Sequence, residues 1–367
     1  MKICFISPYP PKKCGISTYT KEIVDSLVNN NINVTVVPFN CSSDIKYVYS
    51  KLKKNNPDIV RIEYALSIYG LLSPLVLAIL YIFKIKNKNK TIVNFHEVKK
   101  EIDLLGILGI ANYFLVSMLF DKIYVHTKEA KEILENKCRI NSQKISIIPH
   151  STFNFVDTNY YNKELKAQYK LSNKPIVLYF GFILSDKGIE YLLEAIHHLQ
   201  IYNPNLVKRI QVIIAGDVRP RSGVFKCFEK KDRQYKNRLK KISKEFQLNE
   251  TVKFIGFIEE KFVYSLIKLA SIAVMPYTKV EQSGVLHRIL PLNKPIIASN
   301  IGGLQETLKK VGILVKPRNA VAIAEAITLL LKNKNYYKKI SNGYKKLSRK
   351  LDVSQVNNIF IESLVNP

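Results

Sequence analysis

Glycine and lysine residues stand at several points where an apolar run of the sequence ends and a helical pattern begins. Gly15 closes the loop after the first such run, and Gly181 and Lys187 follow the run 176–180. A helix start presents unpaired backbone N–H groups and the positive end of a dipole, which suit a phosphate. Glycine admits a ligand close to the backbone, and an ammonium neutralises a pyrophosphate. Taken singly, Gly15 fits a tight turn and Lys187 a surface side chain; together they predict a diphosphate site, with Lys187 exposed in it.

A third group follows the apolar run 272–275. The carboxylate of Glu281 can accept hydrogen bonds from sugar hydroxyls, and Arg288 can reach a phosphate or a ribose. Between them, backbone N–H groups at the start of a helical pattern are placed to donate to a ligand. These groups belong to Ser283, Gly284, Val285 and Leu286. The segment therefore predicts a site for a sugar joined to a phosphate.

Short apolar runs alternate with helical patterns in both halves of the chain. In the first half the runs are 2–7, 33–37, 58–62, 91–95, 122–126 and 144–148, with helical periodicity at 18–29. In the second half they are 176–180, 211–215, 252–255, 272–275 and 295–298, with helical patterns at 188–199, 233–246, 261–269 and 320–331. Such alternation predicts parallel sheets covered on both faces. The fold class is therefore α/β, with two Rossmann-like domains facing each other across a cleft.

A polar segment, 157–174, separates the two halves and places the boundary. We expect an N-terminal domain at 1–165 and a C-terminal domain at 166–349. The helical pattern 353–365 predicts that 350–367 crosses back to the first domain. In open α/β sheets, ligands bind beyond the carboxyl ends of the strands, which is where the candidate residues fall.

The chain carries a formal net charge of +28, from 57 Lys and Arg against 29 Asp and Glu. Such a field attracts nucleic acid, an anionic membrane or a phosphorylated ligand, although solvated surface lysines explain it equally well. Nucleic-acid binding stays a minor alternative, because no basic–aromatic strip or zinc-finger spacing occurs. The five cysteines form neither a metal cluster nor a disulfide framework, which predicts a reducing, cytoplasmic location.

Two long apolar stretches lie in the first half, at 65–83 and 104–120. The first has the length of a membrane span, but Gly70 and Pro74 interrupt it, so a buried or membrane-touching helix is the better interpretation. Four lysines follow it, at 84, 86, 88 and 90. The two stretches predict either ordinary core helices or peripheral attachment to an anionic membrane face.

In this order, the segments resemble those of the group 1, family-four retaining glycosyltransferases with the GT-B fold, over nearly the whole chain. Gly15 matches the first glycine loop, and Asn94-Phe95-His96-Glu97 is similar to the strand-end histidine motif. The segment 147–150 is similar to the one that closes the first domain. Gly181 through Lys187-Gly188 resembles the phosphate-binding lysine motif. Glu281 through Leu286, followed by the segment 294–303, resembles the paired-glutamate motif.

The resemblance implies a role for each residue. His96 would lie near the sugar and orient it at the reacting carbon, Lys187 would bind the distal phosphate, and Glu281 would hold sugar hydroxyls. Glu63 and Tyr64, which end another strand, are expected on the acceptor side. His126 and His150 follow strands as well, but we expect packed or hydrogen-bonded side chains there. No histidine pair has metal-ligand spacing with a carboxylate, and no bound metal or other cofactor is expected.

Two positions depart from the family pattern. An arginine usual in the family is replaced by Phe182, and Arg219, Arg221 or Arg288 are candidates to substitute for it. The usual second glutamate is replaced by Arg288 or Ile289, depending on the alignment. The hypothesis is transfer of a hexose from a GDP- or UDP-sugar to a lipid-linked or polysaccharide acceptor. The alternative is a homologue that binds the nucleotide sugar without turnover, as a partner subunit.

Overall fold

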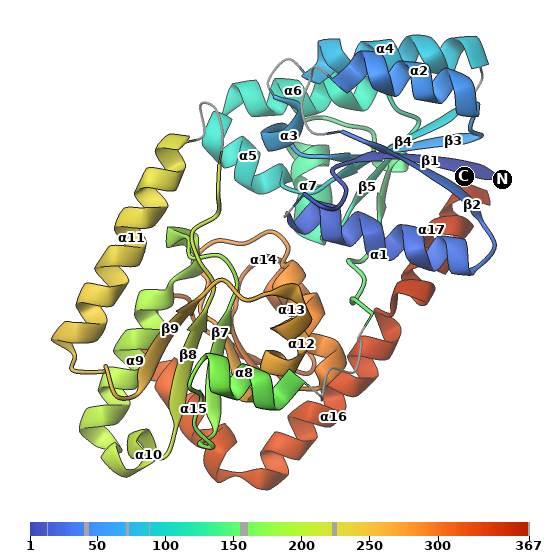
Figure 1. Cartoon of the computed structure of the whole chain (residues 1–367). Coiled ribbons are helices and arrows are strands. Elements are labelled where there is room, and N and C mark those ends of the chain that lie inside the picture. Colours follow the sequence, from blue (N-terminus) through green and yellow to red (C-terminus); the bar gives the residue numbers. More distant parts are fainter. Residues whose placement is uncertain are drawn as a thin grey trace. The chain divides into compact units, whose positions relative to one another are not determined.

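The computed structural model describes residues 1–12, 14–39, 44–70, 73–87, 89–154, 161–221 and 226–365. The described chain forms two compact units, coloured by sequence in Figure 1. The first unit comprises Met1–Asn154 together with Lys350–Pro367, and the second comprises Phe155–Arg349.

Within the described residues, the first unit holds a parallel sheet of six strands in the order β2-β1-β3-β4-β5-β6. Their bounds are β1 (Lys2–Ser7), β2 (Asn33–Pro38), β3 (Ile59–Tyr64), β4 (Lys90–Phe95), β5 (Lys122–Val125) and β6 (Ile145–Ile147). The apolar runs of the first half coincide with these strands, so the prediction of a parallel sheet there is confirmed.

Helices cover both faces of this sheet because successive strand side chains point in opposite directions. The helices are α1 (Gly15–Asn29), α2 (Ile45–Asn55), α3 (Leu66–Tyr69), α4 (Ser73–Asn87), α5 (Val98–Leu105), α6 (Ile107–Met118), α7 (Lys128–Asn136) and α17 (Val353–Val365), with the short turn η2 (Ser142–Lys144). Ile3 and Phe5 of β1 pack with α1 and α17, which lie side by side in Figure 1. Cys4 and Ile6 point to the opposite face, into the cluster shared with α2, α4 and α6.

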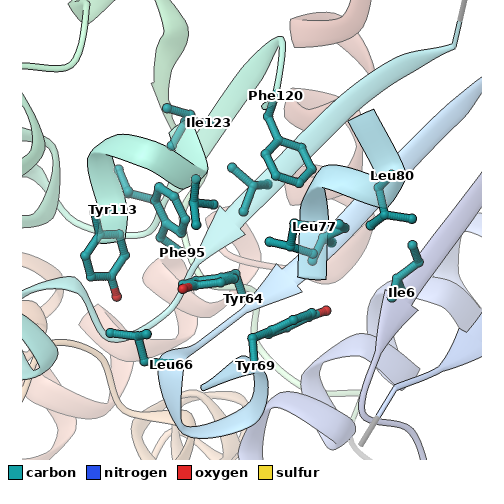
Figure 2. Close-up of a cluster of buried hydrophobic side chains, with 14 of the residues drawn as sticks. Ile6, Tyr64, Leu66, Tyr69, Leu77, Leu80, Phe95, Tyr113, Phe120 and Ile123 are labelled. Atoms are coloured by element: carbon teal, nitrogen blue, oxygen red, sulfur yellow. The ribbon is translucent and has the colours of Figure 1, made fainter. Parts of the chain in front are cut away.

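That second cluster combines aliphatic side chains with a group of aromatic rings (Figure 2). The rings of Tyr64 and Tyr69 stack with centroids 5.1 Å apart, and Phe95 meets Tyr113 edge-on at 4.8 Å. The Tyr64 hydroxyl lies 2.6 Å from Ser73 Oγ and 2.5 Å from Asn112 Oδ1. These bonds satisfy the polar atoms that α4 and α6 bring into an otherwise apolar layer.

The two apolar stretches of the first half fold as consecutive helices of the first unit. The stretch 65–83 falls on α3 and α4, and its residues 71–72 lie outside the described residues. The stretch 104–120 runs from the end of α5 through α6, and Gly106, which has φ +55°, separates the two helices. In the described chain, no helix combines the length and apolarity that crossing a bilayer requires.

The second unit repeats the architecture, with a six-stranded parallel sheet among its described residues in the order β12-β11-β10-β7-β8-β9. The strands are β7 (Ile176–Phe180), β8 (Gln211–Ala215), β9 (Val252–Gly256), β10 (Ala270–Met275), β11 (Ile296–Ser299) and β12 (Ile313–Val315). The helices are α8 (Asn162–Gln168), α9 (Ile189–Tyr202), α10 (Pro204–Lys208), α11 (Lys226–Glu245), α12 (Glu260–Leu269), α13 (Gly284–Ile289), α14 (Gly302–Leu308), α15 (Ala320–Lys332) and α16 (Lys334–Lys350), with the turns η4 (Ser185–Lys187) and η6 (Leu290–Leu292). Two Rossmann-like sheets are therefore confirmed. β12 and α16 were not predicted, and α8 lies in the segment expected to be a polar connection.

Candidate functional site

Polar side chains gather in the first unit where β3, β4, β5 and β6 end. Each is buried or nearly so; Tyr19 comes from α1, and the others come from these four strands or from the residues that follow them. We call this group the polar cluster; its members are Tyr19, Arg61, Glu63, Asn94, His96, His126 and His150. Because the carboxyl ends of parallel strands meet at one edge of a sheet, residues far apart in sequence converge there.

An ion pair lies at the base of the polar cluster. Arg61 Nε donates to Glu63 Oε1 at 2.7 Å, and the two side chains are 1% and 0% exposed. The guanidinium lies 5.2 Å from the ring centroid of Phe5 and 4.7 Å from that of Phe360. Burial alone would raise the pKa of Glu63, but Arg61 and hydrogen bonds from His96 and Asn94 outweigh it and lower the pKa to about 2. Glu63 is therefore a carboxylate at neutral pH.

His96 uses one ring nitrogen to contact this carboxylate. Its Nε2 lies 2.7 Å from Glu63 Oε2, and Asn94 Nδ2 donates to the same oxygen at 2.6 Å. Because an ionised carboxylate only accepts hydrogen bonds, the proton of this contact belongs to His96 Nε2. In the neutral ring, Nδ1 then carries the lone pair.

His126 and His150 complete the polar cluster around Tyr19. The Tyr19 ring lies 5.5, 5.3 and 4.7 Å from the rings of His96, His126 and His150. Burial lowers the pKa of His126 well below its ordinary value and that of His150 to about 4. Both are hydrogen-bonded to backbone carbonyls, as expected from the sequence, and both are neutral at pH 7. Their assembly with His96 was not predicted.

Glu63 and Tyr64 separate although they are neighbours in sequence. Adjacent strand residues point to opposite faces, so Glu63 enters the polar cluster and Tyr64 enters the aromatic core (Figure 2). The Tyr64 hydroxyl is buried with Ser73 and Asn112. Its side chain is thus a core side chain, whereas the sequence analysis expected it beside Glu63 on the acceptor side.

In the second unit, glycines let neighbouring strand-end loops approach closely. Gly181 N–H donates to Ala215 O at 3.0 Å, and a Cβ on Gly216 would lie 1.8 Å from Gly181 O. Gly188 has φ +58°, and a Cβ there would lie 2.2 Å from Pro276 O. Since no side chain fits at these contacts, glycine is required for the loops after β7, β8 and β10 to meet.

Lys187 lies in the turn η4, beside the loop that follows β10. Thr278 N–H donates to Asp186 O at 2.9 Å, which holds the two loops together. Lys187 Nζ lies 3.9 Å from the ring centroid of the buried Tyr277, within range of a cation–π contact. Lys187 is half-buried by this packing, whereas the sequence analysis expected it to be exposed.

Glu281 is 9% exposed and belongs to a loop joined to the start of α14. Gly303 N–H donates to Glu281 O at 2.9 Å, and a Cβ on Gly303 would lie 2.4 Å from that oxygen. Ser283 caps α13, because its Oγ accepts from Leu286 N–H at 3.4 Å. The structure therefore brings Gly181, Lys187, Glu281 and 283–286 to one edge of the second sheet, after β7 and β10.

The remaining candidates are placed as follows. Arg288 Nη1 donates to Glu260 Oε1 at 2.7 Å, and Arg221 pairs with Asp232 at 3.1 Å. Gly15 begins α1 of the first unit and is exposed, and a Cβ at this position would have no other atom within 4 Å. Steric crowding within the chain therefore does not require glycine at position 15. Among the described residues, no group of three or more His, Cys, Asp or Glu is arranged to hold a metal ion.

Sequence reasoning gave no role to Tyr19, Arg61 or Asn94 of the polar cluster, or to Tyr277 and Gly216 of the second unit. A signal for Arg61 was present in the sequence IVRIEY of β3, where Arg61 lies two residues before Glu63. Charged residues two apart in a buried strand share a face, and two opposite charges there predict an ion pair. Tyr277 and Gly216 carry no comparable signal, because their contacts are with residues distant in sequence.

Known proteins share both the sequence pattern and the fold of this chain. Residues 162–347 match the family model described as glycosyl transferases group 1. The chain is 26% identical over 210 residues to an alpha-D-kanosaminyltransferase of Streptomyces kanamyceticus, covering 56% of this chain and 50% of that protein. It is 23% identical over 341 residues to a 2-deoxystreptamine N-acetyl-D-glucosaminyltransferase of Niallia circulans, covering 86% and 80%. The chain thus spans about half the length of the first of these relatives.

Solved structures resemble the whole chain. The HepE protein of Anabaena, solved in complex with UDP-glucose, has a TM-score of 0.73 at 15% identity, covering 100% of each chain. Sucrose-phosphate synthase of Thermosynechococcus elongatus has a TM-score of 0.74 at 17% identity, again over 100% of each chain. At these identities the likeness establishes the fold, with its two Rossmann-like domains.

Proposed function

Because this chain belongs to the group 1 glycosyl transferases, we propose that it transfers a hexose from a nucleotide diphosphate sugar to a glycan or lipid-linked acceptor. The observation that carries the proposal is the loop arrangement of the second unit. There, glycine-dependent contacts join the loops after β7, β8 and β10 beside one lysine. The Lys187 ammonium beside these tightly joined loops suits a diphosphate.

The proposed roles follow from the chemistry of each group. Lys187 binds the distal phosphate, while backbone N–H groups near Gly284 contact phosphate or sugar. Glu281 holds sugar hydroxyls, and His96 orients the reacting carbon. We propose that the configuration at that carbon is retained, with attack on the face from which the phosphate leaves and without a bound metal. UDP and GDP are the candidate nucleotides; HepE, solved with UDP-glucose, supports the first.

The test is a thermal-shift screen of the protein with UDP-, GDP- and ADP-linked sugars, followed by transfer assays with the donor that binds. A donor that binds only the folded state, at a concentration 100 times its Kd, adds about 2.7 kcal/mol of stability. The melting temperature of the protein therefore rises. The absence of both a shift and sugar hydrolysis across the panel would contradict the proposal.

A second candidate function is donor binding without turnover. It is favoured by Phe182 at the position of the family arginine, and by the engagement of Arg288 and Arg221 with Glu260 and Asp232. A clear thermal shift with no transfer to any acceptor from a cell extract would support this function over the first.

We also propose peripheral attachment of the first unit to an anionic membrane face, in keeping with a lipid-linked acceptor. On α6 every exposed residue is apolar: Ile107, Leu108, Ala111, Phe114, Leu115 and Met118. At helical spacing they form one continuous face, and Ile107 is 83% exposed. Leu104 of α5 and Ile82 of the neighbouring α4 are also exposed. Surface apolar side chains gathered in this way mark an interaction site.

Charge favours an anionic bilayer over a second copy as the occupant of this face. Lys144 Nζ donates to Ser117 O at the end of α6, and Lys84 of α4 lies 5.6 Å from the ring centroid of Tyr81 and pairs with Asp121. A second copy would bring another net charge of +28 to the contact, whereas anionic lipid supplies the opposite sign.

Sedimentation with phosphatidylcholine vesicles, with and without phosphatidylglycerol, tests this attachment. Ile107→Ser with Met118→Ser should abolish binding to the anionic vesicles. The matched control, Ile201→Ser with Tyr202→Ser, removes apolar side chains of similar exposure from α9. Equal binding by both double variants would contradict the proposal. Size-exclusion chromatography gives a second test. A dimer formed by the wild-type protein but not by the α6 variant would also contradict the proposal.

A further inference from the structure

Glu63 has no surface through which it could touch a substrate. Its side chain is 0% exposed, and both carboxylate oxygens are occupied by partners within the first unit. Oε1 accepts from Arg61 Nε at 2.7 Å, while Oε2 accepts from Asn94 Nδ2 at 2.6 Å and lies 2.7 Å from His96 Nε2. Any influence of Glu63 on a bound sugar must therefore pass through a neighbour.

Among these neighbours, His96 is the one for which the contact has a chemical consequence. A neutral imidazole has two tautomers, and a partner that can only accept a hydrogen bond selects the one protonated toward it. Arg61 ensures that Glu63 is such a partner, because it holds the group as a carboxylate in a buried position. Arg61, Glu63 and His96 thus form a chain in which each member fixes the state of the next.

We propose that Glu63 is a positioning residue: it holds His96 with the proton on Nε2 and leaves the Nδ1 lone pair for the reacting sugar or acceptor hydroxyl. The proposal rests on the function proposed above and assigns Glu63 a role through His96 in place of direct contact with the acceptor. Arg61 acts one step further back, by keeping the carboxylate charged and in place.

The substitution Glu63→Gln is expected to reverse the tautomer of His96. Arginine has only donors, so the amide oxygen of the new side chain must face Arg61. Its NH2 group then faces both His96 and Asn94 and requires an acceptor on each; rotation of the Asn94 amide presents its Oδ1, and His96 must present a ring lone pair. His96 Nε2 must lose its proton, which moves to Nδ1. A change of one carboxylate oxygen to nitrogen is therefore expected to switch the imidazole from one tautomer to the other.

Nitrogen NMR of protein labelled at histidine reads this directly, since protonated and unprotonated ring nitrogens resonate far apart. The His96 signals are assigned by their disappearance in His96→Gln. The wild-type protein should carry the His96 proton on Nε2, and Glu63→Gln should carry it on Nδ1. A matched control, Ser73→Ala, removes another buried polar partner from the first unit and should leave the His96 signals unchanged.

Kinetics provide the second readout. In Glu63→Gln, kcat should fall about 100-fold, because a reacting group is misdirected, while KM for donor and acceptor change less than about twofold. A raised acceptor KM with unchanged kcat would overturn the proposal in favour of direct acceptor contact. A wild-type His96 protonated on Nδ1 would also overturn it.

The wild-type tautomer is measurable even if Glu63→Gln does not fold, and it requires no turnover. Failure of the proposed glycosyl transfer is seen separately, as wild-type protein that neither binds nor hydrolyses any nucleotide sugar. The two failures are therefore distinguishable.

Discussion

The two sheets use different means to shape the edge where their strands end. The first unit buries an ion pair, an amide and imidazoles, so its edge is defined by side-chain charge and hydrogen bonding. The second unit brings backbone carbonyls to positions where only glycine fits, and a lysine lies over a tyrosine ring. The first edge should therefore respond to charge and pH, and the second to the volume of single side chains.

The largest expected effect is loss of charge from the first edge. Glu63→Gln leaves Arg61, which is 1% exposed, without a carboxylate, and removing one partner of a buried pair costs about 3–5 kcal/mol. Urea denaturation of the full chain, wild type and variant, measures this loss in the free energy of unfolding. The control is Asp25→Asn, which breaks the exposed Lys21–Asp25 pair and should cost less than about 1 kcal/mol. Similar losses in the two variants would remove the distinction between buried and surface charge.

The second effect adds volume to the other edge. Gly188→Ala places a Cβ 2.2 Å from Pro276 O at φ +58°, and strain with overpacking should lower the unfolding free energy of the second unit by about 3 kcal/mol. Gly15→Ala is the matched control, because nothing lies within 4 Å of its Cβ position. Its stability should change by less than about 1 kcal/mol. A stable Gly188→Ala protein would show that the loops can separate without loss.

The third effect is a pH response of the first unit. The pKa values of His126 and His150 are depressed in the folded state, so the unfolded chain takes up protons as pH falls below 6.5 and the folded state does not. Stability therefore falls as the pH is lowered through 6.5, by about 2 kcal/mol for His150 between pH 7 and 5, and the titration of His126 adds to this loss.

Denaturation of wild type and of His150→Gln at pH 7 and pH 5 checks this response. The variant should lose less stability than the wild type over the same interval, because one of the two titrating groups is gone. An equal loss in both proteins would assign the pH response to other groups.

The smallest effect concerns the donor. Lys187→Ala should raise the donor KM about tenfold, because one charge-assisted contact to phosphate is lost, with little change in stability. Lys240→Ala, which removes an exposed lysine from α11, should leave the donor KM unchanged. Unaltered kinetics in Lys187→Ala would show that the phosphate lies elsewhere.

The sequence by itself determined the alternation of strands and helices in both halves. Apolar runs such as 176–180 are short, rich in β-branched residues and bounded by turn signals, and each such run became a strand. It also determined the order of the glycine, histidine and lysine segments. It did not reveal β12, which is only three residues long, or α16, although Tyr337, Ile340 and Tyr344 recur at helical spacing between its lysines.

Only the tertiary structure decided which polar residues meet. Arg61, Asn94, His126 and His150 belong to different strands and loops, and their convergence depends on strand order and register, which local patterns do not encode. The same holds for the separation of Glu63 from Tyr64, since the face that receives each side chain is set by the pleat and by what packs against it. Short-range periodicity fixes elements, whereas long-range packing fixes the partners of each side chain.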